Sequence, residues 1–151
     1  MKQLKQVFLI YFSSMINKVE HLGIAVKDID SSNKLFAKLL GKQHYKTESI
    51  ESESVITSFF KIGEQKIELL QSTDETGPIA KFIEKRKEGI HHLALHVDNI
   101  VEEVKRLKKE GFEFISETPK NGADNKIIVF LHPKTTNGVL IELCQNTENK
   151  Q

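Results

Sequence analysis

The sequence predicts an α+β fold in which two βαβββ modules form one curled mixed sheet with a cup on its concave face. Three observations predict it. The stretch HLGIAVKDID, which begins at His21, resembles HLALHVDNIV, which begins at His92. Each stretch is followed by a helical pattern that stops at a glycine, and the two halves end alike, on KIELL and on VLIELC. Such self-similarity is typical of a duplicated structural unit.

The 151 residues suit one domain. We expect it to cover residues 15–147, with a first module over about 17–72, a connector over about 73–88 and a second module over about 89–146. The apolar run Val7–Phe12 is shorter than the roughly 7–15 apolar residues of a signal peptide and the roughly 20 that span a bilayer. We therefore expect residues 1–14 to be a disordered extension and the protein to be cytoplasmic.

The composition argues against two classes of partner. Charged residues make up 28% of the chain, and its net charge is +1. Because lysines and glutamates are interleaved, neither a nucleic-acid footprint nor a basic membrane patch is indicated. Cys144 is the only cysteine, which excludes an internal disulfide and fits a reducing compartment.

The first module reads as strand, helix and further strands. Alternating apolar residues in HLGIAV predict the first strand. A helix is expected over 31–40, ended by Gly41, because four apolar residues form one stripe there: Leu35, Phe36, Leu39 and Leu40. The strands SVITSFFKIG and QKIELLQ follow.

The second module repeats this order after a short helical connector around GPIAKFIEKRKEG. Its first strand is HHLALHV, and its helix is expected over 101–110, with Gly111 as the stop. The apolar stripe of that helix consists of Val101, Val104 and Leu107. The segments EFISE, KIIVFLHP and GVLIELCQ are expected to be strands.

Side-chain alternation sorts each of four strands into two faces. One face is aliphatic in every case and can be covered by the two helices. The other carries one histidine or one glutamate per strand: His21, Glu68, His92 and Glu142. We define the concave face that brings these four side chains together as the cup. By the same alternation His91 falls on the opposite face, and we expect no role for it.

Two inward-facing carboxylates need a positive partner, because an isolated carboxylate away from water is very costly. Two imidazoles and two carboxylates suit a divalent first-row metal such as Co²⁺, Mn²⁺, Ni²⁺ or Zn²⁺, with positions left for water or substrate. The lack of cysteine ligands argues against a closed structural zinc site.

The paired modules, with histidine and glutamate at matching positions, resemble the vicinal oxygen chelate superfamily. Within it the chain is similar to the methylmalonyl-CoA epimerase family from about Lys18 to Gln145, above all in PIAKFIEKRKEGIHHLALHVDNI and SETPKNGADNKIIVFLHPKTTNGVLIELCQ. The resemblance implies metal ligands at His21, His92 and Glu142, and a fourth at Glu68, where some members carry glutamine. It also implies a homodimer and a CoA thioester substrate; cobalt is the metal we expect first.

The reaction that the resemblance implies converts (R)- and (S)-methylmalonyl-CoA by α-proton abstraction, a metal-stabilised enolate and reprotonation. Glu142 is our candidate for one acid/base group. Some relatives carry a catalytic glutamate where this chain has Thr57, and threonine cannot act as a base near neutral pH. His96 is one candidate for the second group, and Glu68 or a bound water are others, so that role stays open.

Three lysines in and beside the stretch PKNGADNKIIVFLHPK can meet the CoA phosphates as mobile positive charges: Lys120, Lys126 and Lys134. Two other enzyme classes of the superfamily are alternatives. A glyoxalase-type isomerase or lyase uses a similar site, and an extradiol dioxygenase uses two histidines and one carboxylate. The alternative from a different class is a non-catalytic member that binds a small molecule in the same cup.

Overall fold

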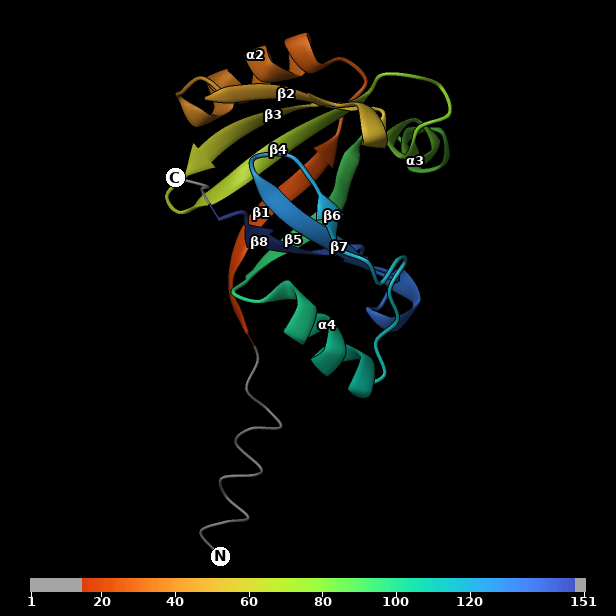
Figure 1. The fold of residues 1–151 in the computed structure, drawn as a ribbon. Helices are drawn as coiled ribbons and strands as arrows, with labels where there is room; N and C mark the ends of the chain where they lie inside the picture. Colours follow the sequence, from red (N-terminus) through yellow and green to blue (C-terminus); the bar gives the residue numbers. More distant parts are fainter. Residues whose placement is uncertain (1–14, 149–151) are drawn as a thin grey trace, which may run out of the picture.

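The computed structural model describes residues 15–148 as an eight-stranded sheet with three α-helices (Figure 1). The predicted disordered extension, residues 1–14, lies outside the described residues. Among the helices of the described part, none has the length and apolar character needed to cross a bilayer.

The two predicted modules follow one another across the sheet, whose strand order is β2-β3-β4-β1-β5-β8-β7-β6. The first module contributes β1 (Ile16–Ala25), β2 (Lys46–Ile50), β3 (Val55–Ile62) and β4 (Gln65–Ser72). The second contributes β5 (Gly89–Val97), β6 (Lys120–Asn121), β7 (Lys126–Leu131) and β8 (Ile141–Asn146). Read outward from the centre, both halves have the same order, which confirms the duplication.

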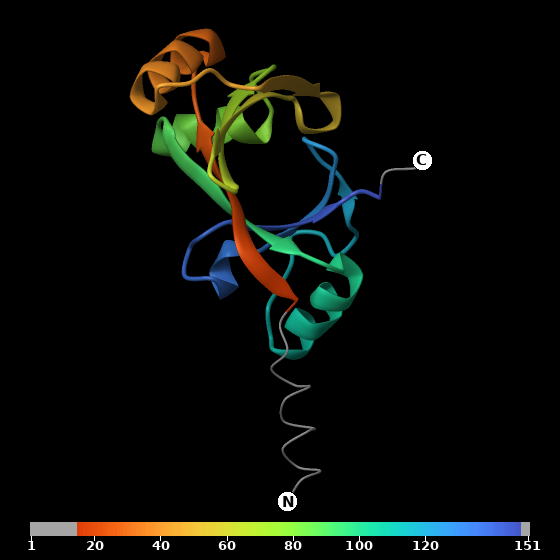
Figure 2. The same ribbon diagram turned by 90° about the vertical axis from the view of Figure 1, so that its left-hand side faces the viewer.

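The two halves meet along β1 and β5, which pair antiparallel, whereas β1–β4 and β5–β8 are parallel pairs. The sheet curls strongly, so that its strands curve around one concave side (Figure 2). The curvature and the mixture of parallel and antiparallel pairs confirm the predicted curled mixed sheet. The four central strands, β4, β1, β5 and β8, carry the four residues that define the cup.

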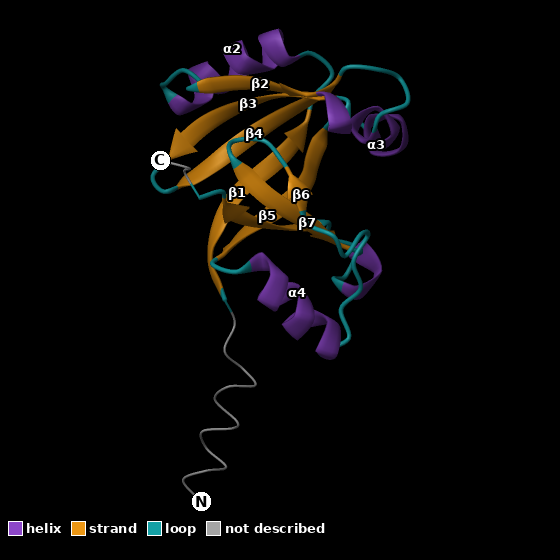
Figure 3. Cartoon of the chain, viewed as in Figure 1, coloured by secondary structure: helices purple, strands orange, loops and turns teal. Residues whose placement is uncertain are grey.

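Three helices pack on the sheet (Figure 3): α2 (Ile29–Leu40), α3 (Pro78–Arg86) and α4 (Ile100–Lys109). The side chain of Asp28 caps α2 by accepting the backbone N–H of Ser31, and Asn99 caps α4 in the same way. Gly41, with a φ of 68°, ends α2 in the left-handed conformation that glycine tolerates. The predicted helix positions and the helical connector are confirmed.

The packing faces of the helices differ in part from the predicted stripes. In α2 the residues that meet the sheet include Ile29, Phe36 and Leu40, at the spacing of one helix face. Leu35 and Leu39 lie beside that face and are 63% and 71% exposed, so only part of the predicted apolar stripe packs on the sheet. In α4, Val104 and Leu107 are buried as predicted. The third predicted member of that stripe, Val101, is exposed.

The second strand of each module also differs from the prediction. The segment EFISE forms only one bridge, between Phe114 and Leu131, and the strand that pairs with β7 is the two-residue β6. The chain leaves the sheet edge between these contacts, where Pro119 has no N–H to donate. In the first module, β2 pairs with β3, although no sequence pattern had indicated a strand there.

Candidate metal centre

Strand register brings the four predicted ligands together from four neighbouring strands. Glu68 of β4 lies opposite Gly23 in the parallel β1–β4 pair, two residues beyond His21. Glu142 of β8 lies opposite Ala94 in the β5–β8 pair, two residues beyond His92. The matching register follows from the repeat. All four residues are buried, between 3% and 5% exposed.

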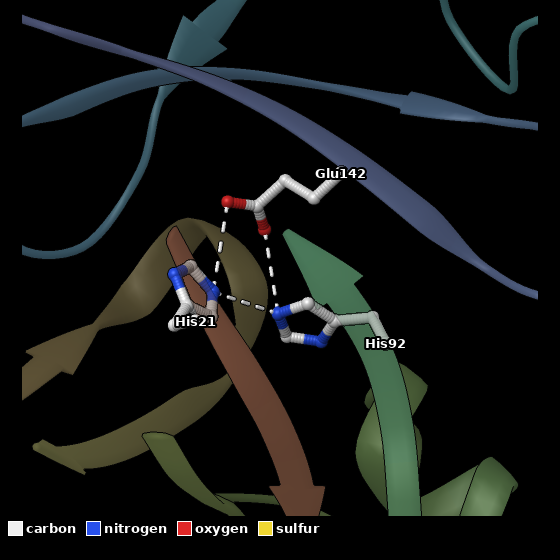
Figure 4. Close-up of side chains that lie close together, drawn as sticks. All are labelled: His21, His92 and Glu142. Atoms are coloured by element: carbon white, nitrogen blue, oxygen red, sulfur yellow. Dashed lines mark hydrogen bonds and ion pairs between the residues drawn. The ribbon is translucent and has the colours of Figure 1, made fainter. Parts of the chain in front are cut away.

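The nitrogen and oxygen atoms of these residues converge on one point. The Nε2 atoms of His21 and His92 are 3.0 Å apart, and Oε2 of Glu68 lies 3.1 and 3.3 Å from them. The Glu142 carboxylate lies 3.8 Å from Nε2 of His21 and 3.6 Å from Nε2 of His92. The two histidines and Glu142 offer ligand atoms that all lie within 4.8 Å of one another, and their side chains point toward each other (Figure 4).

This donor set fits a divalent metal ion. Ligand atoms that share one ion at about 2.1 Å lie roughly 3–3.5 Å from one another, which is close to the separations found here. Two imidazole nitrogens with two carboxylates are a ligand mixture that first-row divalent metals accept. The expectation that His21, Glu68, His92 and Glu142 face one cup agrees with this geometry.

The two carboxylates experience different surroundings. Burial acts to raise the pKa of Glu68, but hydrogen bonds with His21 and His92 outweigh it and lower that pKa to about 2. Burial raises the pKa of Glu142, and the nearby histidines offset this only in part. The histidines thus stabilise the negative charge of the buried Glu142 carboxylate only in part. A cation bound between the four side chains would stabilise it further.

The pKa of His21 is raised by its neighbours. Burial acts to lower its pKa, but hydrogen bonds with Glu20 and Glu68 raise the pKa to about 10. In the metal-free protein these hydrogen bonds therefore favour a second proton on the His21 ring. Because Nε2 must be free to bind a metal, metal binding at this site releases that proton.

Two β-bulges change which side chains face the cup. In the β1–β5 ladder Val19 pairs with Leu95 and the next pair is His21–Ala94, so β1 has one residue without a partner there. Gly23 pairs with His92 and the next pair is Ile24–Ile90, so β5 has one residue without a partner there. Glu20 and His91 are therefore extra residues, and each turns to the same face as the histidine that follows it. The prediction that His91 points away from the cup is wrong, since alternation fails at a bulge.

Both bulge residues contact the adjacent histidine. The Glu20 carboxylate accepts a short hydrogen bond from Nδ1 of His21 and lies 2.5 Å from the Lys66 ammonium group. Nδ1 of His91 lies 3.0 Å from Nδ1 of His92. Burial lowers the pKa of His91 to about 4, so that its ring is neutral at pH 7. Sequence reasoning missed both residues, because a bulge leaves no fixed sequence pattern.

The four predicted ligands line a cavity that encloses about 670 Å³ of empty space, counting its open mouth. Its walls are largely apolar and include Phe59, Leu70, Ile128 and Phe130. Thr57 also lines the cavity and is 1% exposed, and its hydroxyl has no hydrogen-bond partner among residues 15–148. A concave, largely apolar site with a few polar groups is typical of a binding site for a small organic ligand.

The turn between β6 and β7 closes one side of the cavity. The Asp124 carboxylate accepts hydrogen bonds from the Lys66 ammonium group at 2.8 Å and from the Tyr45 hydroxyl at 3.0 Å. The backbone N–H of Asp124 donates to Glu48 at 2.9 Å. This turn of the second module is thus tied to the first module.

The remaining predicted site residues lie at different distances from the cup. Nδ1 of His96 is 2.8 Å from the side-chain oxygen of Asn17, and His96 is not among the described residues that line the cavity. Lys126 lines it and is buried, with its ammonium group beside Glu20 and Asn146. Lys120 forms an ion pair with Glu53, and Lys134 with Glu113.

Comparison with known proteins identifies the family. Residues 20–130 match the model of the Glyoxalase/Bleomycin resistance protein/Dioxygenase superfamily. The chain is 37% identical over 131 residues to human mitochondrial methylmalonyl-CoA epimerase, covering 86% of this chain and 74% of that protein. It is 38% identical over 133 residues to the ethylmalonyl-CoA/methylmalonyl-CoA epimerase of Cereibacter sphaeroides, covering 87% of this chain and 99% of that protein.

A solved structure of methylmalonyl-CoA epimerase in complex with methylmalonyl-CoA and NH4+ is also similar. Its TM-score is 0.84 and its identity 28%, and the match covers 88% of this chain and 96% of that chain. With the superfamily match and the two relatives, this shows that the chain belongs to the Glyoxalase/Bleomycin resistance protein/Dioxygenase superfamily and, within it, to the methylmalonyl-CoA epimerase family.

Proposed function

We propose that this protein is a metal-dependent epimerase of methylmalonyl-CoA. The observation that carries the proposal is the convergence of two histidines and two glutamates within one apolar cavity, in a chain of the epimerase family. His21, Glu68, His92 and Glu142 would hold the metal ion. Bound there, a divalent ion supplies Lewis-acid stabilisation of the negative charge that grows on the thioester oxygen when the α-proton leaves.

The protein groups supply positioning and proton transfer. The apolar walls exclude water, which strengthens the electrostatic interactions of the substrate inside the cavity. In this proposal the Glu142 carboxylate, which lies 3.8 and 3.6 Å from the two histidines, exchanges a proton with the α-carbon on one side of the planar intermediate. The acid/base group on the other side is open: Glu68 and a bound water are candidates, and His96 stays a prediction although it lies outside the cavity lining.

Solvent deuterium exchange at the α-carbon of methylmalonyl-CoA tests the function directly. The full-length protein, loaded with Co²⁺, should exchange this proton far above the protein-free background. The absence of exchange with Co²⁺ demonstrably bound would overturn the epimerase assignment and favour a non-catalytic binding protein. The same assay on His96→Ala decides whether His96 takes part, because loss of an acid/base group lowers the rate by about 10²–10⁴-fold.

We propose Co²⁺ as the metal, with Zn²⁺, Mn²⁺ and Ni²⁺ as alternatives. The mixed nitrogen and oxygen donor set supports a first-row divalent ion but does not select one of them. Elemental analysis of the purified protein, followed by activity after reconstitution with each ion, identifies it. The highest exchange rate with an ion other than Co²⁺ would replace this choice.

We also propose a homodimer, which family resemblance supports, and binding of CoA phosphates by Lys120 and Lys134, which lie on the surface. Lys126 is the weaker candidate, since its ammonium group faces Glu20 inside the cavity. Sedimentation equilibrium gives the oligomeric state. If Lys120 or Lys134 meets phosphate, its alanine variant should raise KM for methylmalonyl-CoA at low salt and leave kcat unchanged. The cytoplasmic location stays a prediction, tested by cell fractionation.

A further inference from the structure

The residue before His21 fixes how that histidine presents its ring. Glu20 is 2% exposed, and one of its carboxylate oxygens accepts the proton of Nδ1 of His21. Its other oxygen accepts from the Lys66 ammonium group at 2.5 Å and lies 3.5 Å from that of Lys126. A carboxylate held by two lysines has little freedom to move. The Nδ1–H of His21 is thereby fixed, and Nε2 points at Glu68 and at the other predicted ligands of the cup.

The residue before His92 has the corresponding place in the second module. Nδ1 of His91 lies 3.0 Å from Nδ1 of His92, and the His91 ring meets that of Phe82 edge-on at a centroid distance of 4.9 Å. A histidine that binds a metal through Nε2 carries its proton on Nδ1. The nitrogen of His91 is therefore placed to accept that proton, while Phe82 limits rotation of the His91 ring.

The two contacts share one structural origin. Glu20 and His91 are each the unpaired residue of a β-bulge, and each bulge lies directly before a histidine of the cup. Without the bulge, alternation would direct each of these side chains to the helical face. We propose that Glu20 and His91 are positioning residues, which the paired bulges turn inward to orient the two histidine ligands of the metal.

The proposal rests on the proposed metal site and adds an asymmetry to it. Glu20 is a carboxylate, which makes the His21 ring a stronger electron donor as well as orienting it. His91 offers a neutral nitrogen and provides mainly orientation. Loss of Glu20 should therefore weaken metal binding more than loss of His91. If the bulges only curved the sheet, neither side chain would affect the metal.

Affinity for Co²⁺, measured by calorimetry on the full-length metal-free protein, is the first test. Glu20→Ala and His91→Ala should each weaken binding by roughly 10–100-fold, Glu20→Ala the more strongly. Glu20→Gln and His91→Asn keep an acceptor atom and should recover most of the affinity. Glu102→Ala and His132→Ala, which remove an exposed carboxylate and an exposed imidazole, are the matched controls and should bind like the wild type.

Nuclear magnetic resonance of the imidazole groups gives a second readout that a general loss of stability would not produce. In the Zn²⁺-loaded wild type, His21 and His92 should each show a protected Nδ1–H signal. Glu20→Ala should remove the His21 signal through exchange with solvent and leave that of His92, and His91→Ala should do the reverse. If Glu20→Ala does not fold, Glu20→Gln and the two His91 variants provide the same comparison.

The outcomes separate this inference from the proposed function. Wild-type Co²⁺ affinity in both alanine variants, with the wild-type protein binding Co²⁺ tightly, would overturn the positioning role and leave the epimerase proposal standing. A wild-type protein that binds no divalent metal would overturn both. Equal losses in the alanine and the conservative variants would also contradict positioning through an acceptor atom.

Discussion

Gly23 of β1 pairs with His92 of β5, and the imidazole of His92 fills the space where a side chain at position 23 would lie. A Cβ atom added to Gly23 would overlap the ring. We predict that Gly23→Ala displaces His92 and weakens Co²⁺ binding at least tenfold, by calorimetry. The control is a double-mutant cycle on the free energy of unfolding. In a His92→Ala background, where the ring is absent, Gly23→Ala should cost little stability. Unaltered Co²⁺ affinity in Gly23→Ala would contradict this close packing.

The two glutamates of the cup should respond differently to the same substitution. In Glu68→Gln an amide oxygen can still bind metal, so proton exchange should stay within about tenfold of wild type. In Glu142→Gln the proposed proton carrier is lost, and exchange should fall by about 10²–10⁴-fold. Both variants are compared by deuterium incorporation at saturating Co²⁺. An active Glu142→Gln enzyme would remove Glu142 from the acid/base role.

The unpaired hydroxyl of Thr57 is expected to contact the substrate or a water beside it. Thr57→Val keeps the shape of the side chain and removes only the polar group. Loss of one hydrogen bond, about 1 kcal/mol, predicts a rise of roughly fivefold in KM for methylmalonyl-CoA. The metal-free variant should be at least as stable as the wild type, because the hydroxyl has no partner among the residues that the structure describes. An unchanged KM would show that this hydroxyl faces no substrate atom.

The stabilisation that the β6–β7 turn gains from the Asp124 carboxylate should depend on pH. Burial acts to raise the pKa of Asp124, but the hydrogen bond from Lys66 outweighs it, so the native pKa lies below the value of roughly 3.9 in an unfolded chain. The stabilisation is therefore complete above about pH 4 and lost as the pH falls through the native pKa.

Asp124→Asn should accordingly lower the unfolding free energy by about 1–2 kcal/mol between pH 5 and 8. The difference from wild type should shrink below about pH 4. Urea denaturation across this range gives both curves. A difference that is constant down to pH 2.5 would show that the charge of Asp124 is not responsible.

Removing the metal should lower stability as well as activity. A free Co²⁺ concentration 100-fold above Kd stabilises the native state by about 2.7 kcal/mol, which predicts a rise in Tm of roughly 5–10 °C over the chelator-treated protein. Mg²⁺ should give a much smaller rise, because histidine ligands suit it poorly. In His92→Ala the Co²⁺ effect should nearly vanish. An equal rise with Mg²⁺ would point to a site other than the cup.

The main features of this fold and site follow from the sequence because the repeat and strand alternation are both strong constraints. Duplication identified the modules, and alternation selected His21, Glu68, His92 and Glu142 without knowledge of the three-dimensional structure. The same rule misplaced His91 and overlooked Glu20, since one extra residue in a strand reverses the face of its neighbours. Which residue bulges is determined by the partner strand, which lies about 70 positions away in this chain.

The helical faces show a similar limit. An apolar residue of an amphipathic helix is buried only if the helix turns that residue toward the sheet, and the sequence does not give this orientation. In α2 it directs Phe36 rather than Leu35 to the sheet. The short strands β2 and β6 were missed for another reason. They are edge strands whose pairing depends on β3 and β7, and their own sequences carry little apolar alternation.

The seam between β1 and β5 is reciprocal: His21 pairs with Ala94, and Gly23, the counterpart of Ala94, pairs with His92, the counterpart of His21. The two repeats are thus related as the subunits of a twofold-symmetric dimer are. A polypeptide of half this length, associating with a copy of itself, would place the same four donor groups around its symmetry axis.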